Sequence, residues 1–177
     1  MPLPVAHGLV GATVVALVHA PAAVRRGWPL LIGAALAVCP DLDYVVGSHR
    51  TFTHSLVSGL VATAALMAFG GRAGVRAGLA YGLALTSHGL LDFAATEHGR
   101  GVMLLWPLSD AWFKLGVFSF SEFAGGRFPL TRVLERGLAE AVTFTPVLLA
   151  VLLLRLRSET GGAGRAARGR VTISSED

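Results

Sequence analysis

The sequence has little charge and a single cysteine, and no basic residue precedes its first apolar run. Only 15% of its 177 residues are charged, whereas 53% are hydrophobic and the mean hydropathy is +0.62. Soluble domains usually contain about 25% charged and about 45 to 50% apolar residues. The composition therefore argues against an ordinary soluble protein and predicts an integral membrane protein of the all-α class.

Two further absences narrow the possibilities. A lone cysteine, Cys39, excludes an intrachain disulfide and a cysteine-based zinc site, and we expect it to be a buried packing residue. A secretory signal peptide needs basic residues ahead of its apolar stretch, and none precedes the run from residue 3 to 24. That run is therefore predicted to be the first membrane span.

The net charge of +4 comes largely from arginines near the chain's end, without interleaved aromatic residues. This pattern argues against nucleic-acid binding and is typical of a topology and lipid-headgroup signal. By the positive-inside rule we expect a cytoplasmic tail. The arginines used for this assignment are Arg25, Arg26, Arg72, Arg76, Arg155, Arg157, Arg165, Arg168 and Arg170.

The apolar runs predict a bundle of about five transmembrane helices. The fourth run is rich in glycine and alanine, so we expect it at the centre, where small residues allow close helix contact. Residues 97–136 break the pattern and predict a short interfacial or re-entrant segment between helices four and five. We assign residues 1–157 to one transmembrane domain and 158–177 to a disordered basic tail. The five predicted spans are 3–24, 28–46, about 51–69, 77–95 and about 137–154.

Polar side chains concentrate between Pro40 and Ser55, flanked on both sides by apolar runs. An ionisable side chain at membrane depth is costly unless it is paired, hydrated or metal-bound, so this stretch is predicted to be a functional site. With five spans, odd spans start and even spans end on the same face. The polar residues that this places together on the outward face are His7, Asp41, Asp43, His49, His54, His88 and Asp92.

These seven residues are candidate ligands of a divalent metal. His88 and Asp92 are four residues apart, which places them on one face of a helix. Mixed histidine and aspartate ligands suit zinc or manganese, and their number suggests one or two ions. Such a centre activates water and holds a phosphoryl oxygen, while Arg50 is suited to a bidentate phosphate contact. Asp43, His49 and Arg50 are the candidate catalytic residues.

Each candidate also has a purely structural reading. Asp41 or Asp43 can pair with Arg50, His54 can cap its own helix, and His88 can bond to a neighbouring backbone. His7 can equally be a structural residue. We expect His19 to be structural or interfacial and Glu140 to pair with Arg136. A serine triad built on Ser55 or Ser87 lacks a G-x-S-x-G motif.

Several short motifs occur together in the first 110 residues: His7, P-D-L-D (Pro40 to Asp43), H-R-x-x-T-H-S (His49 to Ser55), His88 with Asp92, and G-x-x-L-L-W-P (Gly101 to Pro107). This combination resembles the LexA-regulated, membrane-bound metal-dependent hydrolases, a family of small bacterial inner-membrane proteins. The resemblance covers residues 1 to about 110. It implies that the same seven residues are metal ligands or their immediate partners.

The expected function is therefore hydrolysis of a phosphoester or related bond in a membrane lipid or lipid-linked substrate, by a protein of the inner membrane. One alternative is a non-enzymatic membrane protein that binds or transports a metal ion. Another is a structural or stress-response membrane protein with only ion pairs at these positions. The sequence does not specify an oligomeric state.

Overall fold

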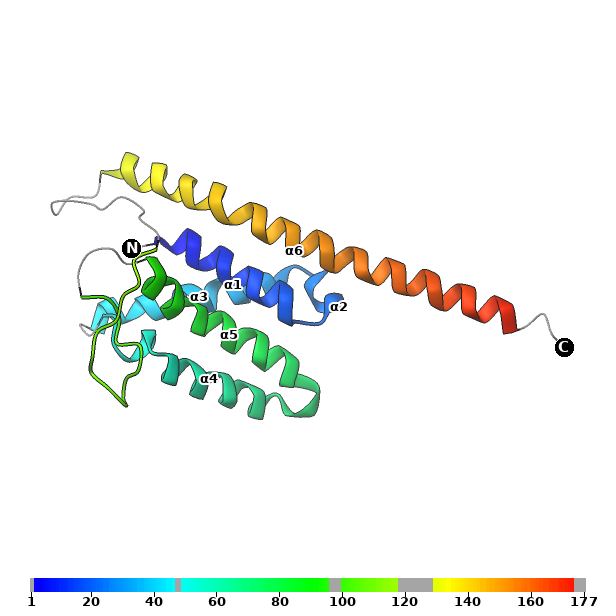
Figure 1. Cartoon of the computed structure of the whole chain (residues 1–177), viewed down its shortest axis with the longest axis horizontal. Coiled ribbons are helices and arrows are strands. Elements are labelled where there is room, and N and C mark those ends of the chain that lie inside the picture. Colours follow the sequence, from blue (N-terminus) through cyan, green and yellow to red (C-terminus); the bar gives the residue numbers. More distant parts are fainter. Residues whose placement is uncertain (1, 47–48, 96–99, 118–128, 174–177) are drawn as a thin grey trace.

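The chain folds into an all-helical bundle, described by a computed structural model (Figure 1). The model describes residues 2–46, 49–95, 100–117 and 129–173. Within these residues the only β-type pairing is an isolated antiparallel bridge between Val102 and Phe113. The all-α prediction is therefore confirmed.

The described residues form six α-helices and two 3-10 helices. The first three α-helices each have a proline in the first turn, where its missing N–H is not needed. The two 3-10 helices follow one another between α3 and α4. In chain order the elements are α1 (Pro4–Val18), α2 (Pro21–Val24), α3 (Trp28–Val38), η1 (Cys39–Val46), η2 (Phe52–His54), α4 (Leu56–Phe69), α5 (Gly71–Ala95) and α6 (Leu130–Ile173).

Helix α5 is the central helix, as its glycine and alanine content predicts. It contacts α1, α3 and α4. Its approach to α4 depends on small residues, because a Cβ added to Gly82 would lie 2.4 Å from Oγ1 of Thr63. Close packing of this kind substitutes for the hydrophobic driving force that is missing between helices in lipid.

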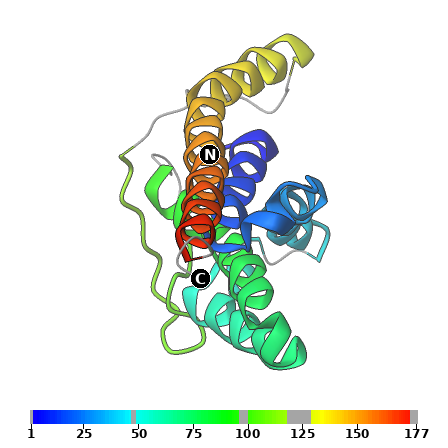
Figure 2. The same ribbon diagram turned by 90° about the vertical axis from the view of Figure 1, so that its right-hand side faces the viewer.

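Helix α6 lies on the opposite side of the bundle from α4 in both views (Figures 1 and 2). It contacts α1 and α2 and extends well beyond the ends of the other helices (Figure 1). Its outer surface exposes many leucine side chains, among them Leu134, Leu138 and Leu149. Such a surface suits contact with lipid.

Two helical segments are long and apolar enough to cross a membrane, Trp28–Val45 and Leu130–Arg157. Helices α1 and α4 are apolar but contain only 15 and 14 residues. At 1.5 Å per residue they span about 21 to 23 Å, less than the roughly 30 Å of a hydrocarbon core. The structure therefore supports two candidate spans, and the count of five stays a prediction.

Some local expectations differ from the structure. Cys39 is exposed rather than buried, because α3 ends at Val38 and the side chain points outward from the start of η1. The first predicted span breaks after Val18, and Pro21 starts the separate helix α2. Helix α6 continues to Ile173, where a disordered tail is expected from residue 158. In the predicted interfacial segment, residues 100–117 form no helix, and 118–128 lie outside the described residues.

Candidate metal centre

The predicted ligands gather at one end of the bundle. At this end α1 and α4 begin, and α3 and α5 end (Figure 1). Three overlapping groups bring potential ligand atoms within 4.8 Å of one another: His7, His88 and Asp92; Asp41, His54 and His88; Asp43, His49 and His54. The predicted convergence of these seven residues is therefore confirmed, although their role as ligands stays a prediction.

The two aspartates of the P-D-L-D motif lie on opposite sides of His54. Pro40 cannot continue the hydrogen-bond ladder of α3, and the chain proceeds as the 3-10 helix η1. Asp41 Oδ1 lies 3.7 Å from His54 Nε2, whereas Asp43 Oδ2 lies 3.4 Å from His54 Nδ1. Asp41 therefore faces the centre of the cluster, and Asp43 supports His54 from behind.

A hydrogen-bond chain fixes the tautomer of His54. The Thr53 hydroxyl donates to Asp43 Oδ2, so its oxygen is free to accept from His54 Nδ1–H at 2.9 Å. The proton on Nδ1 leaves a lone pair on Nε2. A metal-binding histidine usually donates its other ring N–H to a carboxylate, a backbone carbonyl or water. Here the Thr53 hydroxyl connects the His54 ring to the Asp43 carboxylate.

His88 is oriented in the same way from α5. Its Nδ1 donates to the Ala37 carbonyl at 2.7 Å, which again leaves the lone pair on Nε2. The two Nε2 atoms of His54 and His88 lie only 2.9 Å apart. Two lone pairs facing each other at this distance repel, so the arrangement favours a cation bound between them or a proton shared by them.

Close backbone contact holds His54 against α5. A Cβ added to Gly89 would lie 2.1 Å from the His54 carbonyl oxygen, so only glycine fits at this point. Ser55 then caps α4, because its Oγ accepts from the Val57 and Ser58 amides. The N-cap residue of α4 is therefore Ser55 and not His54.

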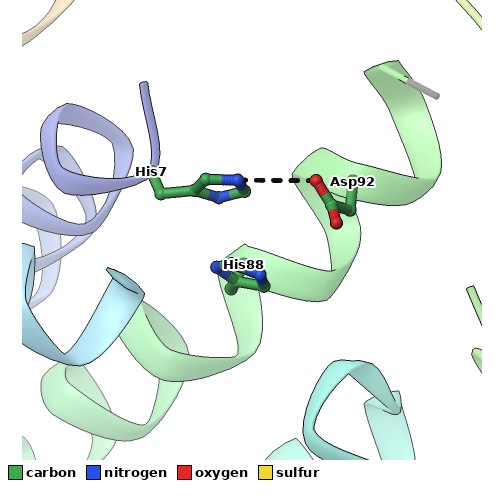
Figure 3. A group of neighbouring side chains, drawn as sticks. All are labelled: His7, His88 and Asp92. Carbon is green, nitrogen blue, oxygen red and sulfur yellow. Dashed lines mark ion pairs between the residues drawn. The ribbon is translucent and has the colours of Figure 1, made fainter. Parts of the chain in front are cut away.

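Asp92 and His7 complete the inner group. Asp92 Oδ2 lies 3.5 Å from His54 Nε2, and Asp92 Oδ1 lies 3.4 Å from His7 Nε2 (Figure 3). The His7 ring stacks on His88 with centroids 3.9 Å apart. His7 is buried, and neither of its ring nitrogens has a hydrogen-bond partner among the described residues. Such an arrangement is costly unless a ligand is present.

The spacing of the inner donor atoms fits a metal ion. The Nε2 atoms of His54 and His88 and the carboxylate oxygens of Asp41 and Asp92 are separated by 2.9, 3.4, 3.5 and 3.7 Å in the measured pairs. Donors about 2.0 to 2.1 Å from a tetrahedral zinc ion stand roughly 3.3 to 3.4 Å apart. The measured pairs are therefore near the spacing of metal ligands, and these residues could hold a divalent ion.

His49 forms the outer edge of the site. Its Nδ1 lies 2.7 Å from Asp43 Oδ1, and 24% of its side chain is exposed. Asp43 thus contacts both histidines, His49 through Oδ1 and His54 through Oδ2. Asp43, His49 and His54 also form a second possible metal-binding group, which keeps open whether one ion or two would bind.

Arg50 lies next to Asp92 rather than in the expected alternative pairing with Asp41 or Asp43. Its Nε is 3.9 Å from Asp92 Oδ2, and 17% of the side chain is exposed. Its backbone has a φ of 65°, a left-handed conformation uncommon for residues other than glycine. The Arg50 carbonyl accepts from the Met103 amide at 3.0 Å, which helps to hold this conformation.

Two contributors to the site are not evident from sequence spacing. The 100–117 segment supports the start of α4, because the Leu104 carbonyl accepts from the Leu56 amide and the Trp106 carbonyl accepts from the Ser55 hydroxyl. The other contributor is Glu140. It accepts from the Leu3 and Ala6 amides at the start of α1, in addition to its expected pairing with Arg136. In the sequence, a glutamate within an apolar helix is the feature that could have indicated this contribution of Glu140.

The fold and the site together define a class: an all-helical membrane protein with a buried histidine–aspartate cluster suited to a metal ion. The profile of the YdjM inner membrane protein family matches residues 1–159. The chain therefore belongs to the YdjM inner membrane protein family. Comparison with curated proteins and with solved structures gives no match.

Proposed function

We propose that this protein is a divalent-metal-dependent hydrolase of the inner membrane. The observation that carries the proposal is the pair of facing Nε2 atoms on His54 and His88, both with Nδ1 engaged elsewhere. Carboxylate oxygens of Asp41 and Asp92 lie at coordination spacing around them. Zinc or manganese, as one or two ions, suits this donor set.

The proposed ligands are His54, His88, Asp41 and Asp92, with His7 as a further ligand beside Asp92. When bound, such an ion lowers the pKa of a water molecule and polarises a phosphoryl oxygen. Arg50 is proposed to bind phosphate oxygens through its guanidinium group, which its partial exposure allows. His49 is proposed as a general base, because its Nδ1 bonds to Asp43 and leaves a lone pair on Nε2.

A membrane lipid or lipid-linked phosphoester is the proposed substrate. Apolar side chains are exposed beside the cluster, including Leu42, Tyr44 and Val45 between and after the two aspartates. Phe52 and Trp106, also exposed, form a ring contact with centroids 6.0 Å apart. An apolar and aromatic rim around a polar centre suits the boundary between headgroups and acyl chains.

Elemental analysis of the purified protein, combined with a screen of phosphoester and lipid substrates, tests the proposal. We expect zinc or manganese to co-purify, and His54→Ala or Asp92→Ala to abolish both metal content and hydrolysis. His19→Ala is the matched control, because His19 ends α1 at the far end from the cluster and bonds to the Ala20 amide. Full metal content in His54→Ala and Asp92→Ala would contradict the proposal.

One observation favours a second function, metal binding or transport without hydrolysis. The side chains of His7, His54, His88 and Asp92 are all at most 1% exposed, so substrate access depends on Asp41, His49 and Arg50. Metal-dependent ion flux into liposomes containing the protein, without hydrolysis of any lipid in the screen, would favour this alternative.

We also propose five membrane crossings, with the metal centre outward and the C-terminal end in the cytoplasm. The clustering of polar residues at one end of the bundle supports this topology. The α2–α3 and α4–α5 connections lie at the other end (Figure 1), and beside them are Arg25, Arg26, Arg72 and Arg76. Reporter fusions after α2 and after α4 should report the cytoplasmic side. The resemblance to LexA-regulated hydrolases adds regulation by LexA to the proposal, testable by induction after DNA damage.

A further inference from the structure

Helix α6 makes polar contacts with both ends of α1. Near the metal centre, Glu140 Oε1 accepts from the Leu3 amide at 2.6 Å and Oε2 accepts from the Ala6 amide at 3.0 Å. At the far end, Arg155 donates from Nε to the Ala16 carbonyl at 3.2 Å and from Nη2 to the His19 carbonyl at 2.8 Å. A carboxylate thus meets the start of α1, and a guanidinium meets its end.

These charges match the electrostatics of α1. The first amides of a helix carry partial positive charge and the last carbonyls carry partial negative charge. The α1 N-cap residue, Leu3, provides no side-chain cap. Glu140 accepts from the Leu3 amide and shares the Ala6 amide with the Leu3 carbonyl, which lies 3.1 Å from it. The two helices run in the same direction (Figure 1). Glu140 and Arg155 are about 22 Å apart along α6, close to the length of α1.

We propose that α6 is an axial clamp on α1 and that Glu140 is a positioning residue for His7. His7 directly follows Ala6, whose amide Glu140 holds, so a shift of α1 along its axis would move His7 away from Asp92. The clamp itself follows from these contacts alone, whereas its effect on metal binding rests on the proposed function above.

The burial of Glu140 supports a specific role. Its side chain is fully buried although the surrounding helix is largely exposed, and Arg136 Nε lies 3.7 Å from its Oε1. Burying a carboxylate in a membrane protein is costly, and close van der Waals packing can also hold two helices together in lipid. A carboxylate at this position adds a defined register between α6 and α1, which leucine or valine side chains do not provide.

Amide hydrogen exchange of the full-length protein tests the clamp without any metal. Glu140→Gln should speed exchange in peptides covering residues 2–12 by about tenfold or more, because two hydrogen bonds to a charged acceptor are weakened. Glu135→Gln is the control, since Glu135 lies on the same helix and is 69% exposed. Unchanged exchange in Glu140→Gln would overturn the clamp.

A zinc titration in two backgrounds tests the link to His7. Glu140→Gln should weaken zinc binding about tenfold in the otherwise native protein and by less than twofold in His7→Ala, because positioning His7 no longer matters there. An equal loss in both backgrounds, or no loss in either, would overturn the positioning role. If the native protein binds no metal, the proposed function fails, and the exchange experiment still decides the clamp.

Discussion

At the scale of single residues, His54 is the residue on which the site depends. Its Nε2 faces His88, Asp41 and Asp92, and its Nδ1 faces Thr53 and Asp43. The sequence could predict that these residues gather, because motif spacing and span parity determine which end of the bundle they reach. It could not predict which ring nitrogen faces which carboxylate, because that depends on the path of the chain through η1 and η2.

A substitution of Asp43 tests whether this residue is a metal ligand or only supports the His54 ring. Asp43→Asn should weaken zinc affinity about 10- to 100-fold without changing the number of ions bound, because Asp43 acts from behind His54. Competition with a chromogenic chelator measures the affinity. Asp110→Asn, a change to an exposed carboxylate in the 100–117 segment, should have no effect. A loss of one bound ion in Asp43→Asn would instead make Asp43 a ligand.

Gly89 offers a second test at this scale. Gly89→Ala should destabilise the protein by about 1 to 3 kcal/mol and reduce metal content, because the new methyl group would overlap the His54 carbonyl. Thermal unfolding in detergent and elemental analysis provide the two measurements. Gly74→Ala, on the same helix with no atom within 4 Å of its added Cβ, should be neutral or stabilising. Equal behaviour of the two variants would contradict this packing.

At the scale of elements, the sequence predicted best where composition dictates packing. The small residues of α5 indicated a central helix, which agrees with the structure. Prediction was weakest where apolar composition continues across a break. The run from residue 3 to 24 reads as one span, but the chain leaves helical geometry at His19. The contacts between α6 and α1 link residues more than 130 positions apart, which no local pattern encodes.

The contribution of the α4 N-cap, Ser55, to stability can be tested at this scale. Ser55→Ala should cost about 0.5 to 2 kcal/mol of unfolding free energy, because it removes the acceptor for the Val57 amide and the donor to the Trp106 carbonyl. Denaturant titration in micelles measures this change. Thr143→Ala, whose hydroxyl bonds only within its own helix to Ala139, should change stability much less. A Ser55→Ala variant as stable as the native protein would show that the cap contributes little.

At the scale of the whole molecule, the cluster connects four helices through one point. His7 comes from α1, Asp41 from η1 directly after α3, His54 from η2 just before α4, and His88 with Asp92 from α5. An ion bound as proposed would therefore stabilise the whole fold. Its coordination would then offset the cost of collecting buried polar groups at this point.

Removal of the metal should consequently destabilise the entire bundle. At an ion concentration of 100 times the dissociation constant, binding to the folded state contributes about 2.7 kcal/mol, which a chelator would remove. We expect a clear drop in the unfolding midpoint of the native protein with EDTA, and little further drop in Asp92→Ala. A native midpoint that EDTA leaves unchanged would indicate that the cluster is stable without an ion.

The connection between α4 and α5 lies at the opposite end of the bundle from the histidine–aspartate cluster. Gly71, with a φ of 56°, turns the chain there, and the preceding Phe69 is 91% exposed. Along α5, Gly71 is about 26 Å from His88. This hairpin tip is therefore an attachment point for a fluorophore or an affinity peptide, with which the protein can be purified and tracked while its histidines stay untouched.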